Sequence, residues 1–117
     1  MAGPGNPVRN ARWAGPERGT LVAEAVGDID LQRSAAFQAG LMALLERQPR
    51  QIVLDLGGVN YMDSSGVASL VKFLGRVRRS GVGLKLAGIG RRVMSIFEIT
   101  RLDTVFEIRA TEEEALA

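Results

Sequence analysis

The sequence predicts a single α/β domain in which an open mixed sheet of four to five strands packs against about four helices. Short apolar runs of strand length alternate with longer segments of helical periodicity, the pattern of strands and helices packed in layers. The 117 residues are 46% hydrophobic, which is enough to bury one core without disulfides or metals. Glycines and prolines separate the runs and mark the connections between them.

Residues 1–19 form an N-terminal segment that is distinct in composition from the domain predicted over residues 20–117. Its chain breakers are Gly3, Pro4, Gly5, Pro7, Gly15, Pro16 and Gly19. They follow one another too closely for a helix or a long strand, so we expect a flexible segment. Only residues 8–13 could form a short strand there, at the edge of the sheet.

The first strand and helix of the main domain are predicted over residues 20–47. Residues 20–26 have the apolar and β-branched character of a strand, and Gly27 then offers a turn. Asp30 can cap the helix that follows, and Pro49 lies beyond its end. The apolar residues at helical spacing in this segment are Phe37, Leu41, Leu44 and Leu45.

A nearly continuous apolar run over residues 51–56 ends at Gly57-Gly58 and predicts a central strand buried on both faces. A brief connection leads to a second helix, which extends to Arg79. The apolar stripe predicted for this helix consists of Val67, Leu70, Val71, Leu74 and Val77. Phe73 lies beside this stripe, where it could pack at the edge of the core or anchor a partner.

The last third of the chain predicts two more strands and two more helices. Residues 84–87 and 105–108 form short apolar runs of strand length, and residues 91–101 carry apolar side chains at helical spacing. Thr111 and Glu114 have the spacing of a capping box, which predicts a short terminal helix.

The chain contains neither cysteine nor histidine, which excludes several classes of function. Disulfide frameworks, thiolate zinc sites and serine hydrolases with a histidine base all require residues that are missing. Two glycine pairs, at 81–83 and 88–90, begin like a dinucleotide fingerprint, but Leu86 and Val93 occupy the third glycine position. Catalysis by carboxylates alone remains open, but outside the C-terminal group at 112–114 the acidic residues are scattered singly along the chain. We expect a protein that is not an enzyme, with no metal and no cofactor of its own.

Membrane-directed segments are not evident in the sequence. No apolar run approaches the roughly 18 residues of a membrane span, and the N-terminus has no hydrophobic segment typical of a signal peptide. We expect a cytoplasmic protein without a membrane span.

The most informative motif is Asp63-Ser64-Ser65-Gly66, which lies where the second helix begins. Ser64 or Ser65 could simply cap the helix, because the first backbone N–H groups of a helix have no intrahelical partners. Alternatively, a hydroxyl at a helix N-terminus is a position where the fold would tolerate a phosphate. Phosphoserine carries about −1.5 to −2 charges at neutral pH, which beside Asp63 would repel an apolar or acidic partner surface.

Three segments of the sequence resemble the STAS-domain anti-sigma factor antagonists, and together they extend over residues 20–108. The most specific is the apolar run at 52–56 followed by Tyr61-Met62-Asp63-Ser64-Ser65-Gly66-Val67. The turn at 27–30, Gly-Asp-Ile-Asp, is similar to the Gly-Glu-Leu-Asp of the family, and residues 92–103 are similar to its late helix. The residues after the serines differ from the Gly-Leu-Gly of many relatives.

This resemblance implies a STAS-like fold and a partner switch. The unphosphorylated protein would bind an anti-sigma factor that is also a serine kinase, so that a sigma factor is released. Phosphorylation of Ser64, with Ser65 as the alternative site, would end this binding, and a phosphatase would restore it. The kinase would bind the ATP. The residues expected to form or shape the partner-binding site, together with the anchor candidate, are Asp30, Asp63, Ser64, Ser65, Gly66, Val67 and Phe73.

Two other functions remain open from the sequence. The resemblance to STAS subunits allows a role as a scaffold in a signalling or lipid-transport assembly, where docking matters more than phosphate turnover. Between residues 64 and 97 the charged side chains are all basic, which would suit a nucleic-acid binder, but aromatic residues for base stacking are few. A solvated helix face explains these cations more simply. They are Lys72, Arg76, Arg78, Arg79, Lys85, Arg91 and Arg92.

Overall fold

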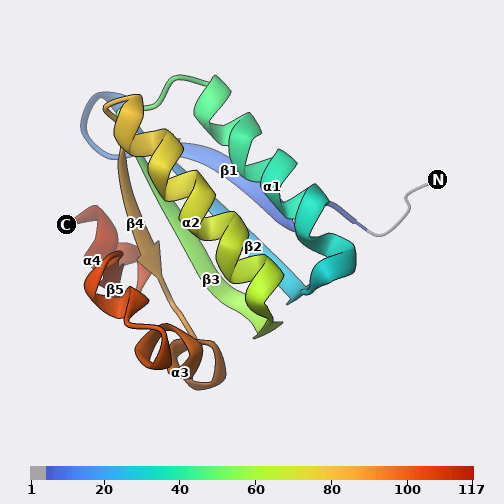
Figure 1. The fold of residues 1–117 in the computed structure, drawn as a ribbon. Helices are drawn as coiled ribbons and strands as arrows, with labels where there is room; N and C mark the ends of the chain where they lie inside the picture. The colour runs from blue at the N-terminus through green and yellow to red at the C-terminus, as the bar shows by residue number, and fades with distance from the viewer. Residues whose placement is uncertain (1–4) are drawn as a thin grey trace.

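The computed structural model describes residues 5–117 as one α/β layer structure around a five-stranded mixed sheet (Figure 1). The strands follow the chain order β1-β2-β3-β4-β5, in which β1 is antiparallel to β2 and all other neighbours are parallel. This arrangement confirms the predicted fold class. The strands are β1 (Val8–Ala14), β2 (Thr20–Ile29), β3 (Gln51–Met62), β4 (Gly83–Ala87) and β5 (Glu107–Arg109).

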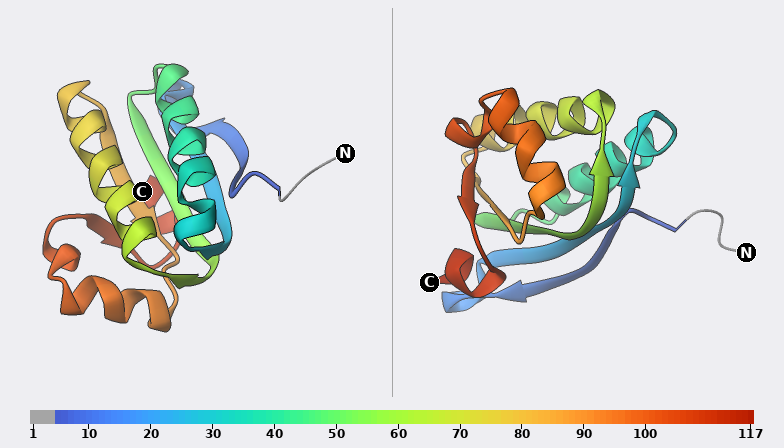
Figure 2. Two further views of the ribbon diagram at one scale, coloured as in Figure 1. Left: turned by 45° about the vertical axis from the view of Figure 1, so that its right-hand side comes forward. Right: turned by 90° about the horizontal axis from the view of Figure 1, so that it is seen from below.

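Helices cover both faces of the sheet, but unequally (Figure 2). The longest two lie side by side on one face, and a short helix at the C-terminus lies on the other (Figure 2). The four helices are α1 (Leu31–Glu46), α2 (Ser64–Arg79), α3 (Arg91–Ile99) and α4 (Glu112–Leu116). The larger core lies under α1, α2 and α3, and a smaller cluster contains Val22, Val53, Ala87 and Ala115.

The central strand β3 is buried on both faces, as predicted. Ile52 and Leu54 belong to the larger core, whereas Val53 between them belongs to the smaller cluster under α4. Successive side chains of a strand point to opposite faces, so the continuous apolar run supplies both layers.

β2 and β3 are both longer than predicted, because the glycines expected to end them lie inside the paired region. β2 continues through Gly27, with irregular register on both sides of Val26. β3 continues through Gly58, which pairs with Val26. A Cβ atom at position 58 would lie 2.8 Å from Cγ1 of Val26 and 3.2 Å from the carbonyl oxygen of Ala25. Here glycine therefore permits close strand pairing rather than a turn.

The N-terminal segment contributes the edge strand that the sequence allowed over residues 8–13. β1 pairs with β2 from Val8 opposite Ala25 to Ala14 opposite Thr20. Residues 16–18 then form a single turn of 3₁₀ helix before β2 begins. The expectation of flexibility was wrong for this part of the segment, because the irregular register between Arg9 and Arg12 accommodates the chain within a paired strand. Residues 1–4 of the predicted segment lie outside the described residues.

The C-terminal elements follow the prediction with small shifts. The last strand lies at Glu107–Arg109 rather than at 105–108, and α3 ends at Ile99. The predicted capping box is present, because the Thr111 hydroxyl accepts a hydrogen bond from the Glu114 amide at 3.1 Å. The Glu114 carboxylate in turn accepts one from the Ala110 amide.

Phe73 is fully buried in the larger core, so its expected role as a partner anchor is wrong for this structure. The buried face of α2 includes Leu70, Phe73, Leu74 and Val77, while Val71 is 43% exposed. The predicted stripe had Val71 in place of Phe73. Both sets fit helical spacing, and the packing of α2 against the sheet and α1 selects the set that contains the larger aromatic side chain.

Candidate functional site

The candidate site lies where the two neighbouring parallel strands β2 and β3 end and a helix begins from each. Ile29 at the end of β2 is paired with Met62 at the end of β3. Each strand is followed by one aspartate, Asp30 or Asp63, and then by the first residue of α1 or α2. Parallel pairing therefore brings two helix N-termini together at one end of the molecule, and the sequence neighbours of both end up in one site.

Both aspartates cap the helices that follow them. The Asp30 side chain accepts a hydrogen bond from the Arg33 amide at 3.1 Å, as predicted. Oδ1 of Asp63 accepts hydrogen bonds from the amides of Ser65 at 2.8 Å and Gly66 at 3.3 Å. Two of the otherwise unpaired donors at the start of α2 are thereby satisfied.

The cap of α2 is therefore Asp63, not Ser64 or Ser65, which corrects the capping interpretation drawn from the sequence. Asp63 has the extended backbone of a cap residue, and the helix begins at Ser64. Ser64 is exposed and Ser65 is half-buried. Since the carboxylate does the capping, the hydroxyl of Ser64 is not needed to hold the helix end.

Asp63 also connects the start of α2 to the start of α1. Its second carboxylate oxygen, Oδ2, accepts a hydrogen bond from the Leu31 amide at 3.2 Å. Its own amide donates to the carbonyl oxygen of Ile29 at 3.2 Å. One side chain thus ties both helix N-termini and the end of β2 into a single unit next to Ser64.

Gly66 is buried beneath this unit and shapes it through close packing. A Cβ atom at position 66 would lie 2.6 Å from Cγ of Met62 and 2.8 Å from the carbonyl oxygen of Ile29. A side chain there would force the start of α2 away from β2. Its place below the surface means that Gly66 positions the serines rather than offering its own surface to a partner.

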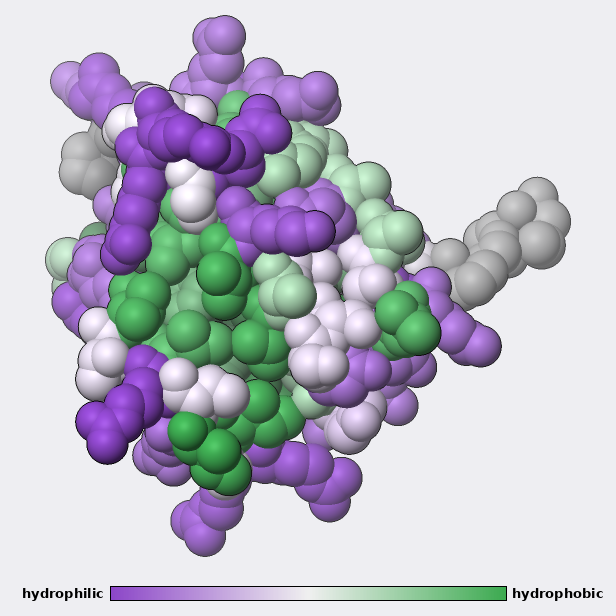
Figure 3. Space-filling model, in the orientation of Figure 1, coloured by the Kyte–Doolittle hydropathy of each residue, from purple (hydrophilic) through white to green (hydrophobic). Residues whose placement is uncertain are grey.

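Ser64 lies at the rim of an apolar hollow between α2 and α3. The hollow, of about 490 Å³, is lined by Tyr61, Met62, Asp63, Ser64, Val67, Ala68, Ile96 and Thr100. Figure 3 shows the corresponding hydrophobic area between these two helices on the face that carries α2. Exposed apolar side chains at this end of the molecule include Tyr61 and Ile99, which is 81% exposed. The site thus combines an exposed hydroxyl with an apolar surface.

Six of the seven predicted partner-site residues lie together at this end of the molecule. They are Asp30, Asp63, Ser64, Ser65, Gly66 and Val67, and only Phe73 lies elsewhere, in the core. The sequence analysis missed the contribution of α3, which supplies Ile96 and Thr100 to the hollow. The apolar spacing of α3 could have indicated a second exposed face, but that pattern alone does not show which face meets α2.

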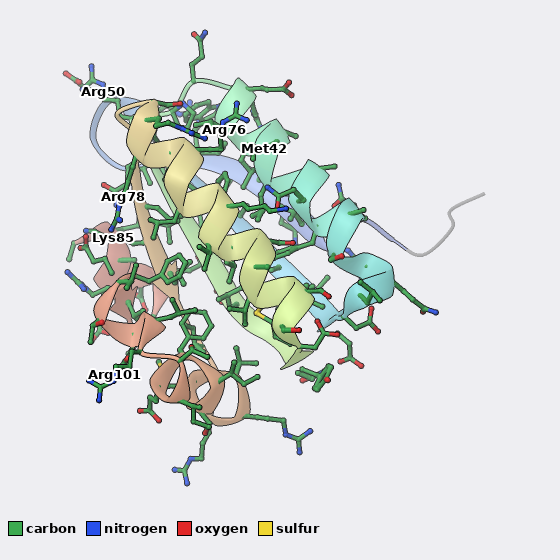
Figure 4. The ribbon with its side chains drawn as sticks, in the orientation of Figure 1. Met42, Arg50, Arg76, Arg78, Lys85 and Arg101 are labelled. Carbon is green, nitrogen blue, oxygen red and sulfur yellow. The ribbon has the colours of Figure 1, made fainter. Side chains whose placement is uncertain are left out.

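The basic residues between positions 64 and 97 do not form one continuous surface. Lys85 lies 3.6 Å from the carboxylate of Glu107 and donates a hydrogen bond to the carbonyl oxygen of Ala115. Arg78 donates to the carbonyl oxygen of Val105 at 3.2 Å. Figure 4 shows Arg78 and Lys85 on one side of α2 and Arg76 on the side toward α1. This division does not favour a single nucleic-acid track.

Comparison with known sequences identifies a matching family and similar proteins. The model of the STAS domain family matches residues 16–115. The chain is 32% identical over 87 residues to an anti-sigma-B factor antagonist of Bacillus subtilis, covering 74% of this chain and 79% of that protein.

Solved structures share the fold at lower identity. An anti-sigma factor antagonist from Mycobacterium paratuberculosis has a TM-score of 0.79 and 22% identity, covering 99% of this chain and 96% of that one. A sulfate transporter family protein from Wolinella succinogenes has a TM-score of 0.75 and 19% identity, covering 88% and 85%. The anti-sigma factor antagonist SpoIIAA in its unphosphorylated form has a TM-score of 0.62 and 20% identity, covering 91% and 94%.

Within residues 5–117, no helix is both long and apolar enough to cross a bilayer.

Proposed function

This chain belongs to the STAS domain family and is a relative of its anti-sigma factor antagonists, and from that membership we propose that it is a partner switch controlled at Ser64. In its unmodified form it binds an anti-sigma factor with serine kinase activity, which frees a sigma factor. Phosphate on Ser64 ends this binding, and a phosphatase reverses the modification. The protein is the substrate of the kinase and has no catalytic role of its own.

The observation that carries this proposal is the position of Ser64. It is exposed, it is the first residue of α2, and it borders the apolar hollow between α2 and α3. Because Asp63 satisfies the first amides of the helix, adding phosphate to Ser64 removes no structural hydrogen bond. The modification can therefore change the surface and leave the fold intact.

The electrostatic effect of phosphate at this position is large enough for a switch. A partner that covers the hollow would remove water from its rim, where a phosphate of about −1.5 to −2 charges would lie next to the Asp63 carboxylate. A hundredfold loss of affinity needs about 2.7 kcal/mol, which one desolvated charge can supply. Ser65 is half-buried, so we expect it to be the poorer phosphate acceptor.

The test is to purify the proteins bound to this chain in cells and to incubate the chain with the captured ATPase of the histidine-kinase-like class and ATP. Peptide mass spectrometry should then place the phosphate on Ser64. Ser64→Ala should abolish incorporation and Ser65→Ala should retain it. Phosphate on Ser65 alone, or on neither serine, would contradict the proposed site.

The switching step is tested separately by affinity. Ser64→Asp should weaken binding to the captured kinase about a hundredfold, because it adds charge at the rim of the hollow. Ala39→Asp adds the same charge to the exposed middle of α1 and serves as the matched control, with little change expected. Equal affinity of the Ser64→Asp protein and the wild type would show that charge at this position does not control binding.

The second candidate is a STAS subunit of a signalling or transport assembly, and it is favoured by the fold shared with the sulfate transporter family protein. That likeness concerns the fold alone, whereas the relative with 32% sequence identity, from Bacillus subtilis, is an anti-sigma-B factor antagonist. Recovery of a permease and a transporter ATPase with this chain, without any serine kinase, would favour this candidate over the switch.

A further inference from the structure

A second surface feature lies between α1 and α2 and extends from the middle of both helices toward their C-terminal ends. We call it the α1–α2 groove; Gln38 and Met42 of α1 line it together with Lys72, Gly75, Arg76 and Arg79 of α2. An adjoining hollow shares Met42 and Arg76 and extends the groove toward the ends of both helices. Figure 4 shows Met42 and Arg76 next to each other in the space between the two helices.

The floor of the groove is apolar and open. Met42 packs against the larger core and is half-buried, and Val71 is 43% exposed on the facing side of α2. Gly75 is exposed in the interior of α2, and a Cβ atom at its position would have nothing within 4 Å. Glycine at such a position weakens a helix relative to alanine. The missing side chain leaves room above the floor that packing within this chain does not use.

Three cations form one edge of the groove. Lys72, Arg76 and Arg79 follow one another at helical spacing on α2, and all three are exposed. None of the ion pairs within residues 5–117 involves them. The lining of the groove itself includes no acidic residue, and the adjoining hollow includes one, Glu46, together with Arg76.

One polar atom of the groove lining also lacks a partner. Oε1 of Gln38 is buried, and no hydrogen bond to it is formed within the described part of the chain. A buried acceptor of this kind is costly unless a donor reaches it. The groove therefore offers an apolar floor, a basic edge and one acceptor.

Compensation of the α2 macrodipole explains part of this arrangement. Cations near a helix C-terminus are favourable, and Arg76 and Arg79 lie in the last turn of α2. That effect needs no apolar floor and no empty volume above Gly75. The combination with Met42 and Val71 requires a further explanation.

We propose that the α1–α2 groove binds an amphipathic helix of a protein partner, whose apolar stripe covers Met42, Val71 and Gly75 and whose acidic residues pair with Lys72, Arg76 and Arg79. The groove between two neighbouring helices accepts a third helix by the usual packing of ridges into grooves. Lys72 and Arg79 are seven residues apart, about 10.5 Å along the axis, so carboxylates spaced by two turns on the partner match them.

An amphipathic helix fits this groove better than a small molecule does. Small-molecule sites enclose most of the ligand surface, whereas this hollow is a broad, open trough whose basic edge extends over two helical turns. Charge along its edge would set the orientation of an incoming helix and raise its association rate.

This surface is independent of the proposed switch. Ser64 and Arg76 are twelve residues apart on one straight helix, about 18 Å along its axis. A partner helix whose contacts are confined to the stretch from Lys72 to Arg79, about 10.5 Å of α2, leaves the Ser64 end free for a kinase. The chain would then carry one constant and one switchable interaction.

The test uses a displayed library of amphipathic helical peptides of about 18 residues, roughly 27 Å long, with random polar faces. The library is selected on the full chain and counter-selected on the Gly75→Leu variant, in which leucine fills the groove. We expect the enriched peptides to carry acidic residues one and two turns apart beside an apolar stripe. On titration of an enriched peptide, amide shifts should cluster at Gln38, Met42, Gly75 and Arg76.

Variants separate binding from folding in this test. Gly75→Leu should lower peptide affinity at least tenfold while the midpoint of thermal unfolding does not fall, because leucine is the better helix former. Arg76→Glu should weaken binding about as strongly. The matched controls on α3 are Ser95→Leu, with the same added apolar surface, and Arg92→Glu, with the same charge reversal, and both should bind like the wild type.

Several outcomes would overturn the proposal. These are enrichment of neutral or basic peptides, amide shifts confined to the Ser64 end, and an unchanged affinity in Gly75→Leu. Tighter binding of a single-stranded oligonucleotide or of vesicles containing anionic lipid, lost on Arg76→Glu, would assign the cations to that ligand instead. Phosphorylation of Ser64 is measured separately and does not depend on any of these results.

Discussion

The Asp63 carboxylate accepts a hydrogen bond from the amide of Leu31 at 3.2 Å, across 32 positions of sequence. The same side chain caps α2 through the amides of Ser65 and Gly66. The beginning of α1 and the beginning of α2 are therefore held by one residue that lies next to the proposed phosphorylation site.

Asp63→Ala should destabilise the protein by about 1–2 kcal/mol, because it removes the cap of α2 and leaves the Leu31 amide without its acceptor. Asp63→Asn retains a side-chain oxygen and should cost less. Urea unfolding monitored by circular dichroism measures both. Asp30→Ala, which removes only the cap of α1, should cost about 1 kcal/mol. An Asp63→Ala protein as stable as the Asp30→Ala protein would show that the link between the helices adds nothing.

Gly66→Ala should destabilise the protein by about 1–3 kcal/mol, since the new Cβ would overlap Met62 and the backbone oxygen of Ile29. The matched control lies in the same helix. Gly75→Ala meets open space and should stabilise the protein by about 0.5–1 kcal/mol. Opposite signs in thermal or chemical unfolding are the expected result, and equal effects would refute the close approach of α2 to β2.

Phe73→Ala should cost about 3–5 kcal/mol because it empties part of the larger core. Val71 belongs to the predicted stripe but is 43% exposed, so Val71→Ala should change the free energy of unfolding by only about 0.5 kcal/mol. Both variants can be compared by equilibrium denaturation. A mild effect of Phe73→Ala together with weakened partner binding would restore the anchor interpretation.

The pH dependence of stability should contain a contribution from Glu112. A hydrogen bond with the Asp55 side chain raises the pKa of Glu112 above its ordinary 4.5, with partial burial adding to the rise and Arg12 opposing it. At pH values between the pKa of Glu112 in the unfolded chain and its higher pKa in the folded protein, the Glu112 carboxyl is protonated more often in the folded state than in the unfolded state. The stabilising contribution is therefore complete below about pH 4.5 and is lost as the pH rises through the folded pKa of Glu112.

Asp55→Asn should lower the pKa of Glu112 and reduce this loss of stability with rising pH. Asparagine retains an oxygen that can accept from the Gly57 amide, as Oδ1 of Asp55 does at 2.7 Å. Carbon-detected NMR titration of the Glu112 carboxyl measures the shift directly. Arg12→Ala should move the pKa in the opposite direction, since it removes the ion pair with Glu112. If the titration midpoint of Glu112 is the same in the wild type and in Asp55→Asn, the carboxyls of Asp55 and Glu112 do not interact.

Much of this fold follows from sequence patterns whose physical cause is local. The buried strand at 51–56 and the caps at Asp30 and Thr111 depend on residues close together in the chain, and they are present as predicted. The extension of β3 through Gly58 depends on its approach to Val26 of another strand. No local pattern distinguishes that glycine from a turn residue.

The site shows the same division between local and tertiary causes. The serine motif and its helix could be located from the sequence, but the choice of Asp63 over the serines as cap follows from the observed backbone and hydrogen bonds. The exchange of Phe73 for Val71 in the buried stripe depends on the rotation of α2 against the sheet. The contribution of α3 to the lining of the hollow depends on tertiary packing, which the spacing of apolar residues along the chain does not specify.

Both edges of the sheet are poorly suited to receive another strand. β5 has three residues, and β1 changes register between Arg9 and Arg12, where Asn10 adopts a positive φ of 56°. Short or distorted edges discourage the strand addition through which sheets aggregate. In the proposed switch, the exchange of partners would therefore leave the backbone hydrogen bonds of the sheet unchanged. Recognition would then depend on side chains of the helical face, where the proposed phosphate on Ser64 would reverse it.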